Sequence, residues 1–280
     1  MKNMRVVVLG GNGMLGHMVW TQFEKAGHIV FPSFRNYACK TAVHGNSFHF
    51  DVRTHTDLRS VIPECDYLIN CIGVIPQRVV PTDDQTLMMS EANHILPRRL
   101  GDLYCDTSTR VVHVTTDCVY SGKLGMYDED SPCDAQDMYG MSKARGEPDT
   151  VMSLRTSIIG PEHDSVGSNL FEWTKKQAGK TIDGYIDHIW NGLTTKALSC
   201  AMMKIIDENL YKRGTYHIFS DRPITKYQLV SAVNKKYKLG INIRKFTTGM
   251  LVDRSLRSKY SLCEHLRIPT FEEMLKDIDE

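Results

Sequence analysis

Several features that would place a chain in a common class are missing from these 280 residues. No pair among the eight cysteines has C-x-x-C spacing, and the eleven histidines show neither H-x-x-x-H nor H-E-x-x-H, so we predict no metal site. No apolar run approaches the ~20 residues of a membrane-spanning helix. The apolar stretch near residue 5 is short and interrupted by glycines, unlike a signal peptide. We therefore expect reduced thiols and a cytoplasmic protein.

An excess of charge of either sign is also lacking. The chain has 34 Lys and Arg against 33 Asp and Glu, a formal net charge of +1. This balance provides no electrostatic basis for binding nucleic acid or an anionic membrane. Hydrophobic residues make up 41%, which is too many for a disordered chain and enough for a buried core.

Runs of β-branched and aromatic residues alternate with amphipathic stretches. We expect strands at 5–9, 28–34, 67–71, 110–115, 151–155 and 215–219. We expect helices at 14–26, 54–61, 84–104 and 138–147, and later ones at 169–177, 196–208, 226–237 and 271–277. This alternation predicts an α/β fold, a Rossmann-type doubly wound parallel sheet.

A glycine-rich turn directly follows the first expected strand. Gly11, Gly13 and Gly16 fit G-x-G-x-x-G, and Gly10 gives the alternative spacing G-x-x-G-x-x-G. Glycines let the backbone approach a pyrophosphate closely, and the N-terminus of the next helix offers unpaired N–H groups. The position of this turn, between a strand and a helix, predicts a dinucleotide site.

The end of the second expected strand indicates which dinucleotide binds. NAD-preferring sites usually carry an acidic residue there, but none occurs between Glu24 and Asp51. Ser33 and Arg35 stand in its place, and an arginine can pair with a 2′-phosphate. We predict NADPH, with NADH as the alternative.

Three further residues suit proton transfer to a carbonyl. Tyr139 and Lys143 are four residues apart and would share one face of a helix, where an ammonium can stabilise a phenolate. Thr116 follows the expected strand 110–115, at the sheet edge where open α/β sheets assemble their sites. Its hydroxyl could hydrogen-bond a substrate oxygen together with Tyr139.

In this order, the motifs resemble the extended short-chain dehydrogenase/reductase family, and within it the dTDP-4-dehydrorhamnose reductase branch. The matching stretches are GGNGMLG at 10–16, NCIGV at 70–74, VTTDCVYSG at 114–122, YDEDSPCDAQDMYGMSKARGE at 127–147, LRTSIIG at 154–160 and WNGLTT at 190–195. We expect an NADP(H)-binding Rossmann domain over 1–160. A smaller mixed α/β substrate domain is expected over 161–280, with some segments returning to the sheet.

The resemblance implies specific roles. Tyr139 would be the general acid, Lys143 would bind the nicotinamide ribose and lower the pKa of the tyrosine, and Thr116 would complete the catalytic set. With Ser33 and Arg35 included, the expected cofactor-binding residues are Gly10, Gly11, Asn12, Gly13, Met14, Leu15, Ser33, Arg35, Asp51, Val52, Cys71, Ile72, Gly73, Tyr139 and Lys143. The expected substrate-binding residues are Val74, Thr116, Asp117, Cys118, Trp190 and Asn191.

The implied reaction is NADPH-dependent reduction of the 4-keto group of a UDP- or dTDP-linked 4-keto-6-deoxyhexose to a 6-deoxy-L-sugar nucleotide for polysaccharide biosynthesis. The base and the C2 substituent stay open, and a 2-acetamido sugar is one candidate. A nucleotide sugar is the expected partner, and a homodimer is the habit of the family.

Three other interpretations are considered. A bifunctional 3,5-epimerase/4-reductase would use a cysteine two residues after the catalytic hydroxyl, and Cys118 stands two residues after Thr116. A 4,6-dehydratase is disfavoured because the triplet 116–118 lacks the second carboxylate of such enzymes. A catalytically inactive NADP(H)-binding regulatory subunit would be expected to have lost part of the Thr, Tyr and Lys set, which is intact here.

Overall fold

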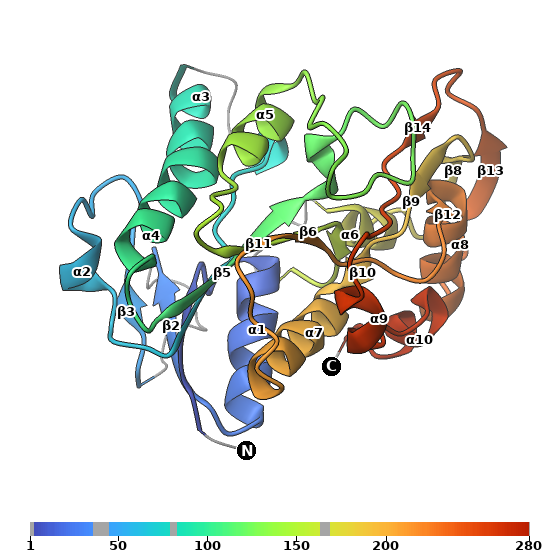
Figure 1. Cartoon of the computed structure of the whole chain (residues 1–280). Coiled ribbons are helices and arrows are strands. Elements are labelled where there is room, and N and C mark those ends of the chain that lie inside the picture. Colours follow the sequence, from blue (N-terminus) through green and yellow to red (C-terminus); the bar gives the residue numbers. More distant parts are fainter. Residues whose placement is uncertain (1–2, 36–44, 79–82, 163–168, 280) are drawn as a thin grey trace.

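The computed structural model describes residues 3–35, 45–78, 83–162 and 169–279 (Figure 1). Its centre is a sheet of seven parallel strands in the order β3-β2-β1-β4-β5-β6-β11. The strands are β1 (Arg5–Leu9), β2 (Ile29–Phe34), β3 (Phe48–His49), β4 (Tyr67–Asn70), β5 (Arg110–Thr116), β6 (Met152–Thr156) and β11 (Gly214–His217). The strand order reverses between β1 and β4, which places a ligand crevice at their carboxyl ends.

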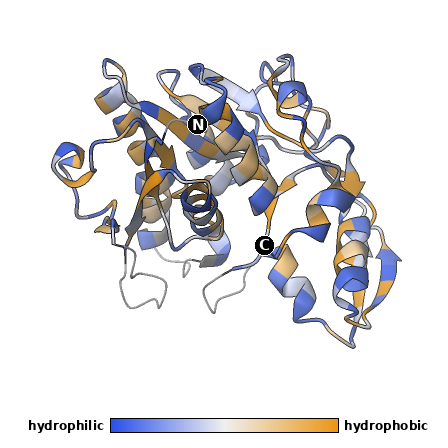
Figure 2. Cartoon of the chain, turned by 90° about the horizontal axis from the view of Figure 1, so that it is seen from below, coloured by the Kyte–Doolittle hydropathy of each residue, from blue (hydrophilic) through white to orange (hydrophobic). Residues whose placement is uncertain are grey.

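The strands are apolar on both faces because both faces are covered. Val6 and Val8 point into one hydrophobic cluster, while Val7 and Leu9 point into the other. Successive side chains of a strand alternate between faces, so a continuous apolar run is the pattern that a doubly covered strand needs. Figure 2 shows the central strands mainly in the colour of hydrophobic residues.

Helices cover the two faces of the sheet. The helices α1 (Met14–Lys25) and α7 (Thr195–Asp207) pack against each other on one face. The other carries α2 (Leu58–Val61), α3 (Asp83–Met89), a π-helical segment η2 (Ser90–Ile95) and α4 (Leu96–Tyr104). The helix α5 (Met138–Arg145) packs on η2 and on the end of β5. Short 3₁₀ turns are η1 (Pro76–Arg78) and η3 (Asp117–Val119).

The C-terminal elements gather beside the sheet (Figure 1). Their strands form pairs and a trio: β7 (Ile158–Ile159) with β10 (Leu193–Thr194), β8 (Thr181–Tyr185) with β13 (Asn242–Phe246), and β9 (His188–Trp190) between β12 (Ile224–Thr225) and β14 (Val252–Asp253). The helices are α6 (Leu170–Lys175), α8 (Lys226–Tyr237), α9 (Leu262–Leu266) and α10 (Phe271–Lys276).

The predicted fold class, a doubly wound Rossmann-type sheet, is confirmed. The division into domains at residue 160 stays a prediction, and β11 from the second part pairs with β6 in the central sheet. Among the described residues, no helix combines the length and apolar character needed to cross a membrane.

A buried ion pair joins β6 to the chain that leaves α5. The Arg155 Nη2 and Glu147 Oε2 atoms are 2.6 Å apart, and both side chains are less than a tenth exposed. The second carboxylate oxygen accepts a hydrogen bond of 2.9 Å from the Thr115 hydroxyl, and Arg155 Nη1 donates to the Tyr120 hydroxyl at 2.5 Å. Each charge therefore has several partners, and removing one charge would leave the other buried without an ionic partner.

We predict that Glu147→Ala destabilises the protein by about 3–5 kcal/mol, because it leaves the Arg155 guanidinium buried and unpaired. The matched control is Glu272→Ala, which removes an exposed partner of Arg222 and should leave the free energy of unfolding nearly unchanged. Urea unfolding of both variants measures the difference. Equal effects would contradict the assignment of Arg155–Glu147 as a buried pair.

Candidate active site

The glycine-rich turn between β1 and α1 has the geometry of a phosphate site. A Cβ at Gly16 would lie 2.1 Å from the Gly10 carbonyl oxygen, so only glycine lets the helix pack on the turn. The N-cap of α1 is Gly13, and no side chain caps this helix. The first N–H groups of α1 have no intrahelical acceptor, and together with the positive end of the helix dipole they fit a pyrophosphate. These residues therefore fit a dinucleotide.

The predicted cofactor residues at the ends of β2 and β3 make different contacts. The buried Ser33 hydroxyl accepts a hydrogen bond of 3.0 Å from the Gly10 N–H, so this side chain positions the turn. Arg35 is exposed at the end of β2, where a 2′-phosphate could reach it. The Asp51 carboxylate accepts from the Arg53 N–H at 3.0 Å and stabilises the turn before Val52. Because β3, β2 and β1 are neighbours, these ends lie along one edge of the sheet.

Leu15 and Met14, two of the predicted cofactor residues, begin helix α1 and differ in burial. Leu15 is 6% exposed within the hydrophobic core, so only its backbone can face a phosphate. Met14, the first residue of α1, receives a hydrogen bond on its sulfur from Asn169. Asn12, between Gly11 and Gly13, completes the turn.

Two of the three predicted catalytic residues, Thr116 and Tyr139, lie close together at the end of β5. The Thr116 hydroxyl lies near enough to the Tyr139 phenol to lower its pKa. It accepts a hydrogen bond from the Cys118 N–H at 3.1 Å and donates to Asp117 Oδ1 at 3.2 Å. Lys143 is 5% exposed and lies one turn after Tyr139 on the same helix.

Helix α5 packs closely on η3. A Cβ at Gly140 would lie 2.3 Å from the Cys118 carbonyl oxygen, and the Asp137 side chain caps the helix by accepting from the Gly140 N–H at 2.9 Å. The cap fixes where α5 starts, and the glycine allows the helix to lie against the strand end. This contact brings Tyr139 to Thr116.

The Lys143 ammonium reaches the nucleotide edge of the sheet. A Cβ added at Gly73, in the loop after β4, would lie 2.9 Å from Lys143 Nζ. The predicted loop residues Cys71, Ile72 and Gly73 therefore border the ammonium, as a role in binding the nicotinamide ribose requires. The Ile72 N–H donates to Asn70 Oδ1 at 3.1 Å, which holds the turn that leaves β4.

Burial controls the pKa values of this group. Burial lowers the pKa of Lys143 to about 8, while the nearby Glu147 and Cys71 favour its charged form. Burial also raises the pKa of Tyr139, with Cys118 adding to the rise and the Thr116 hydroxyl opposing it. Desolvation of the phenolate outweighs the stabilising interactions, so the net shift of the tyrosine pKa is upward, and the expectation that Lys143 lowers this pKa stays a prediction. A protonated phenol at neutral pH suits a proton donor.

Asn93 is a site residue that the sequence reasoning missed. It is fully buried in the π-helical segment η2, where its amide donates to the Val74 carbonyl at 2.9 Å and to the Ser142 hydroxyl at 3.1 Å. Its Oδ1 accepts from the Val74 N–H at 2.8 Å. It thereby ties the loop after Gly73 to the helix that carries Lys143. The available signal was a lone asparagine in the expected helix 84–104.

The predicted substrate residues divide into two groups. Asp117 is buried beside Thr116, and burial raises its pKa and also raises the pKa of Cys118 to about 12. Both border the catalytic hydroxyl. Val74 is held by Asn93 at the other side of the site.

Trp190 and Asn191 have structural contacts of their own, and their predicted contact with the substrate stays a prediction. The Trp190 side chain is 2% exposed and packs edge-on against Phe271. The Asn191 amide donates to the Leu256 carbonyl at 2.8 Å, and its oxygen accepts from the Leu256 N–H at 2.9 Å. The motif gives the position of both residues in the sequence, but it does not tell whether their side chains are buried.

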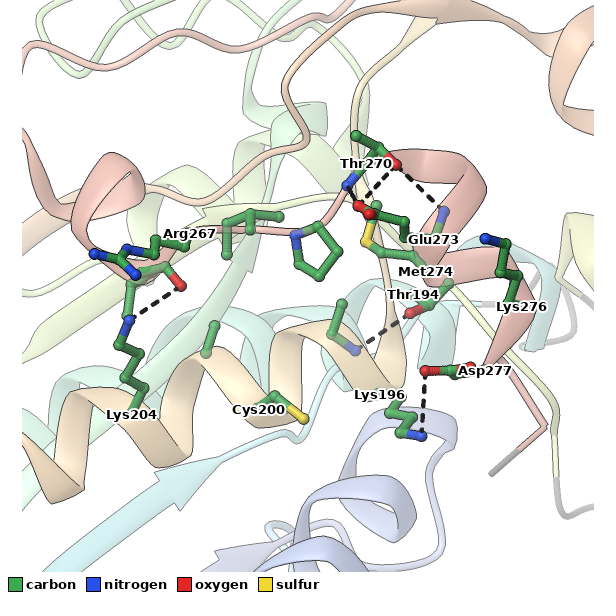
Figure 3. A pocket seen from close by; sticks show the side chains of 15 residues that line it. Thr194, Lys196, Cys200, Lys204, Arg267, Thr270, Glu273, Met274, Lys276 and Asp277 are labelled. Carbon is green, nitrogen blue, oxygen red and sulfur yellow. Dashed lines mark hydrogen bonds and ion pairs between the residues drawn. The ribbon is translucent and has the colours of Figure 1, made fainter.

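A separate cavity of about 690 Å³ lies between α7 and the segment 266–277 (Figure 3). Four of its charged side chains are engaged: Lys196 pairs with Asp277, Glu273 caps α10 through Thr270, and Lys204 donates to the Leu266 carbonyl. None of the three predicted catalytic residues lines it. In the described part of the chain, no group of three or more His, Cys, Asp or Glu side chains could hold a metal ion.

Comparisons with known proteins show the family of this chain. Residues 4–271 match the family described as RmlD substrate binding domain. The chain belongs to this family. The spore coat polysaccharide biosynthesis protein SpsK of Bacillus subtilis (strain 168), a relative, is 26% identical over 281 residues, 94% of this chain and 90% of that protein. The probable low-salt glycan biosynthesis reductase Agl14 of Haloferax volcanii is 26% identical over 244 residues, 79% of this chain and 76% of that protein.

Solved structures of other proteins have the same fold as this RmlD-family chain. The dTDP-4-dehydrorhamnose reductase of Bacillus anthracis str. Ames, solved with NADP, superimposes with a TM-score of 0.78 at 18% identity and covers 99% of both chains. The cofactor prediction, NADPH with NADH as the alternative, agrees with the ligand of that protein. The predicted resemblance to dTDP-4-dehydrorhamnose reductases is confirmed. The expected homodimer stays a prediction.

We predict that Gly73→Ala lowers kcat with little loss of stability. The added methyl group would displace the Lys143 ammonium, the flexible end of a side chain, from the nucleotide edge. The control is Gly45→Ala, where an added Cβ meets nothing within 4 Å. Steady-state kinetics and a melting curve of each variant test this, and wild-type turnover in Gly73→Ala would contradict the placement of Lys143.

We predict that kcat/KM falls above a pH of about 8. The pKa of Lys143 is lowered to about 8 by burial, so the ammonium is present below that pH and lost above it. Its neighbours Cys71 and Tyr139 have raised pKa values and the buried His113 a lowered one, so none of these titrates in the same interval. A pH profile between 6 and 10 measures the effect, and a constant kcat/KM up to pH 10 would contradict it.

Proposed function

We propose that the protein uses NADPH to reduce the 4-keto group of a UDP- or dTDP-linked 4-keto-6-deoxyhexose to a 6-deoxy-L-sugar nucleotide. The observation that carries the proposal is the proximity of Thr116 to Tyr139 at the end of β5, with the Lys143 ammonium beside Gly73. Family membership and the biosynthetic names of the relatives support it.

The residues divide the work of the reduction. When bound, NADPH supplies a hydride to C4 of the sugar. Tyr139 donates its phenolic proton to the C4 oxygen, so that carbonyl, hydride and proton give the alcohol. Thr116 hydrogen-bonds the same oxygen and stabilises the charge that develops there. Lys143 holds the nicotinamide ribose, and its charge stabilises the phenolate until water returns the proton.

Cys118 argues against the epimerase alternative. An epimerase base must take a proton next to the ketone, and a cysteine does so as a thiolate. Burial and the neighbouring Asp117 raise the pKa of the Cys118 thiol to about 12, so the thiol stays protonated at neutral pH. The regulatory-subunit alternative is disfavoured because Thr116, Tyr139 and Lys143 are all present, and an inactive site has no need to keep Thr116 close to Tyr139.

The test is NADPH oxidation with a panel of UDP- and dTDP-linked 4-keto-6-deoxyhexoses, with and without a 2-acetamido group, in deuterium oxide. A reductase oxidises NADPH with at least one of them and leaves C3 and C5 free of deuterium. Deuterium at C3 or C5 would establish the epimerase/reductase instead. No oxidation with any member of the panel would refute the proposal.

We predict that Tyr139→Phe lowers kcat by two or more orders of magnitude and leaves NADPH affinity nearly unchanged. The substitution removes the proton donor and keeps the ring. The matched control is Tyr260→Phe, an exposed tyrosine of the C-terminal region. Turnover of Tyr139→Phe near that of Tyr260→Phe would refute the role of the phenol.

A further inference from the structure

A lysine of the C-terminal region faces the catalytic edge of the sheet. Lys226 is the first residue of α8, whose N-terminus is capped by Thr225 and Gln228. The Lys226 ammonium lies over the ring of the buried Trp190, 5.4 Å from the ring centroid. The side chain is held by this cation–π contact and does not extend into solvent.

The same ammonium interacts electrostatically with the residues after Thr116. Asp117 and Cys118 favour the charged form of Lys226, whereas burial and Arg254 lower the pKa of this lysine. In the described part of the chain, neither Lys226 nor Arg254 comes within the 4.0 Å of Asp117 that defines an ion pair. The carboxylate instead accepts from Thr116 at 3.2 Å and from the Cys118 thiol at 3.5 Å.

Arg254 is the second cation of this group. Its Nε donates to the Tyr120 carbonyl at 2.8 Å, which anchors the guanidinium beside the site. Among the residues that the structure describes, none accepts a hydrogen bond from its two terminal nitrogens. A guanidinium held at Nε with both ends available is suited to a phosphate.

The charges do not balance within this cluster. Lys226 and Arg254 carry two positive charges against the single charge of Asp117, and this carboxylate is not in contact with either cation. Partly buried cations without a contacting anion are costly, and an anionic ligand would remove that cost. In the proposed substrate the 4-keto-6-deoxyhexose is neutral, so the diphosphate is the group that supplies negative charge.

We propose that Lys226, together with Arg254, binds the diphosphate of the nucleotide sugar. This inference rests on the proposed function for the identity of the substrate. Asp117 repels the phosphates, so the diphosphate lies on the side of the two cations. The sugar is left at Thr116 and Tyr139, and the lysine thereby sets the orientation in which C4 meets the catalytic pair.

The experiment measures binding of UDP and of dTDP to the protein saturated with NADP⁺, by calorimetry, for wild type, Lys226→Met, Lys226→Arg and Lys235→Met. Lys226→Met keeps the length of the stem and removes the charge. Lys235 is an exposed lysine near the other end of the same helix and serves as the matched control.

We expect Lys226→Met to weaken the preferred nucleoside diphosphate by about 10-fold or more, the scale of a lost hydrogen bond between charged groups. Lys226→Arg should restore a large part of the affinity, and Lys235→Met should match wild type. Affinity of the parent nucleoside, uridine or thymidine, and of NADP⁺ should not change. If Lys226 had only a structural role, its substitution would change the affinities for all of these ligands together or for none of them.

Unchanged UDP and dTDP affinity in Lys226→Met overturns the inference, and so does failure of wild type to bind either nucleoside diphosphate at millimolar concentration. The proposed function is judged separately by NADPH oxidation with the sugar panel. Binding of a nucleoside diphosphate that depends on Lys226, without reduction of any panel member, would refute the reductase and uphold the diphosphate site.

Discussion

The site depends on keeping one ammonium group away from water at the edge where β4 and β5 end. Burial destabilises the charged form of Lys143, and the surrounding chain compensates with Glu147 and with the loop at Gly73. The loop is held by Asn93, which also hydrogen-bonds Ser142 next to the lysine. If that arrangement loosened, water would reach the lysine and the position of the ammonium beside the nucleotide would be lost.

The second constraint is the approach of α5 to the end of β5. Gly140 permits the contact with the Cys118 carbonyl, and the Asp137 cap fixes the start of the helix. The Thr116 hydroxyl and the Tyr139 phenol meet because of this packing, although 22 residues separate them in the chain. Catalytic geometry here is therefore a result of backbone packing as much as of side-chain chemistry.

Sequence reasoning found the parts of the site whose signal is local. The turn at Gly10–Gly16 and the spacing of Tyr139 and Lys143 are visible within a few residues, and so are the long apolar strands. Asn93 was missed because its role depends on the loop at Val74 and on Ser142, which only the folded chain brings together.

The same limit explains the other differences. Most of the short C-terminal strands, such as β7 and β14, have two residues each, and their pairing is set by tertiary contacts that no periodicity records. Trp190 and Asn191 lie where the motif places them, yet their side chains pack inward. The rise in the pKa of Tyr139 was not predicted, because burial cannot be read from i, i+4 spacing.

The late position of strand β11 in the sequence limits where this chain can be truncated or joined to a relative in a chimera. Residues 214–217 pair with β6 after the chain has already built α6 and α7 outside the sheet. A fragment ending near residue 160 would leave the fully buried strand β6 as an open edge, a template for aggregation. Chimeras with relatives must therefore carry this late strand along with the nucleotide-binding half, and synthesis must pass residue 217 before the sheet can close.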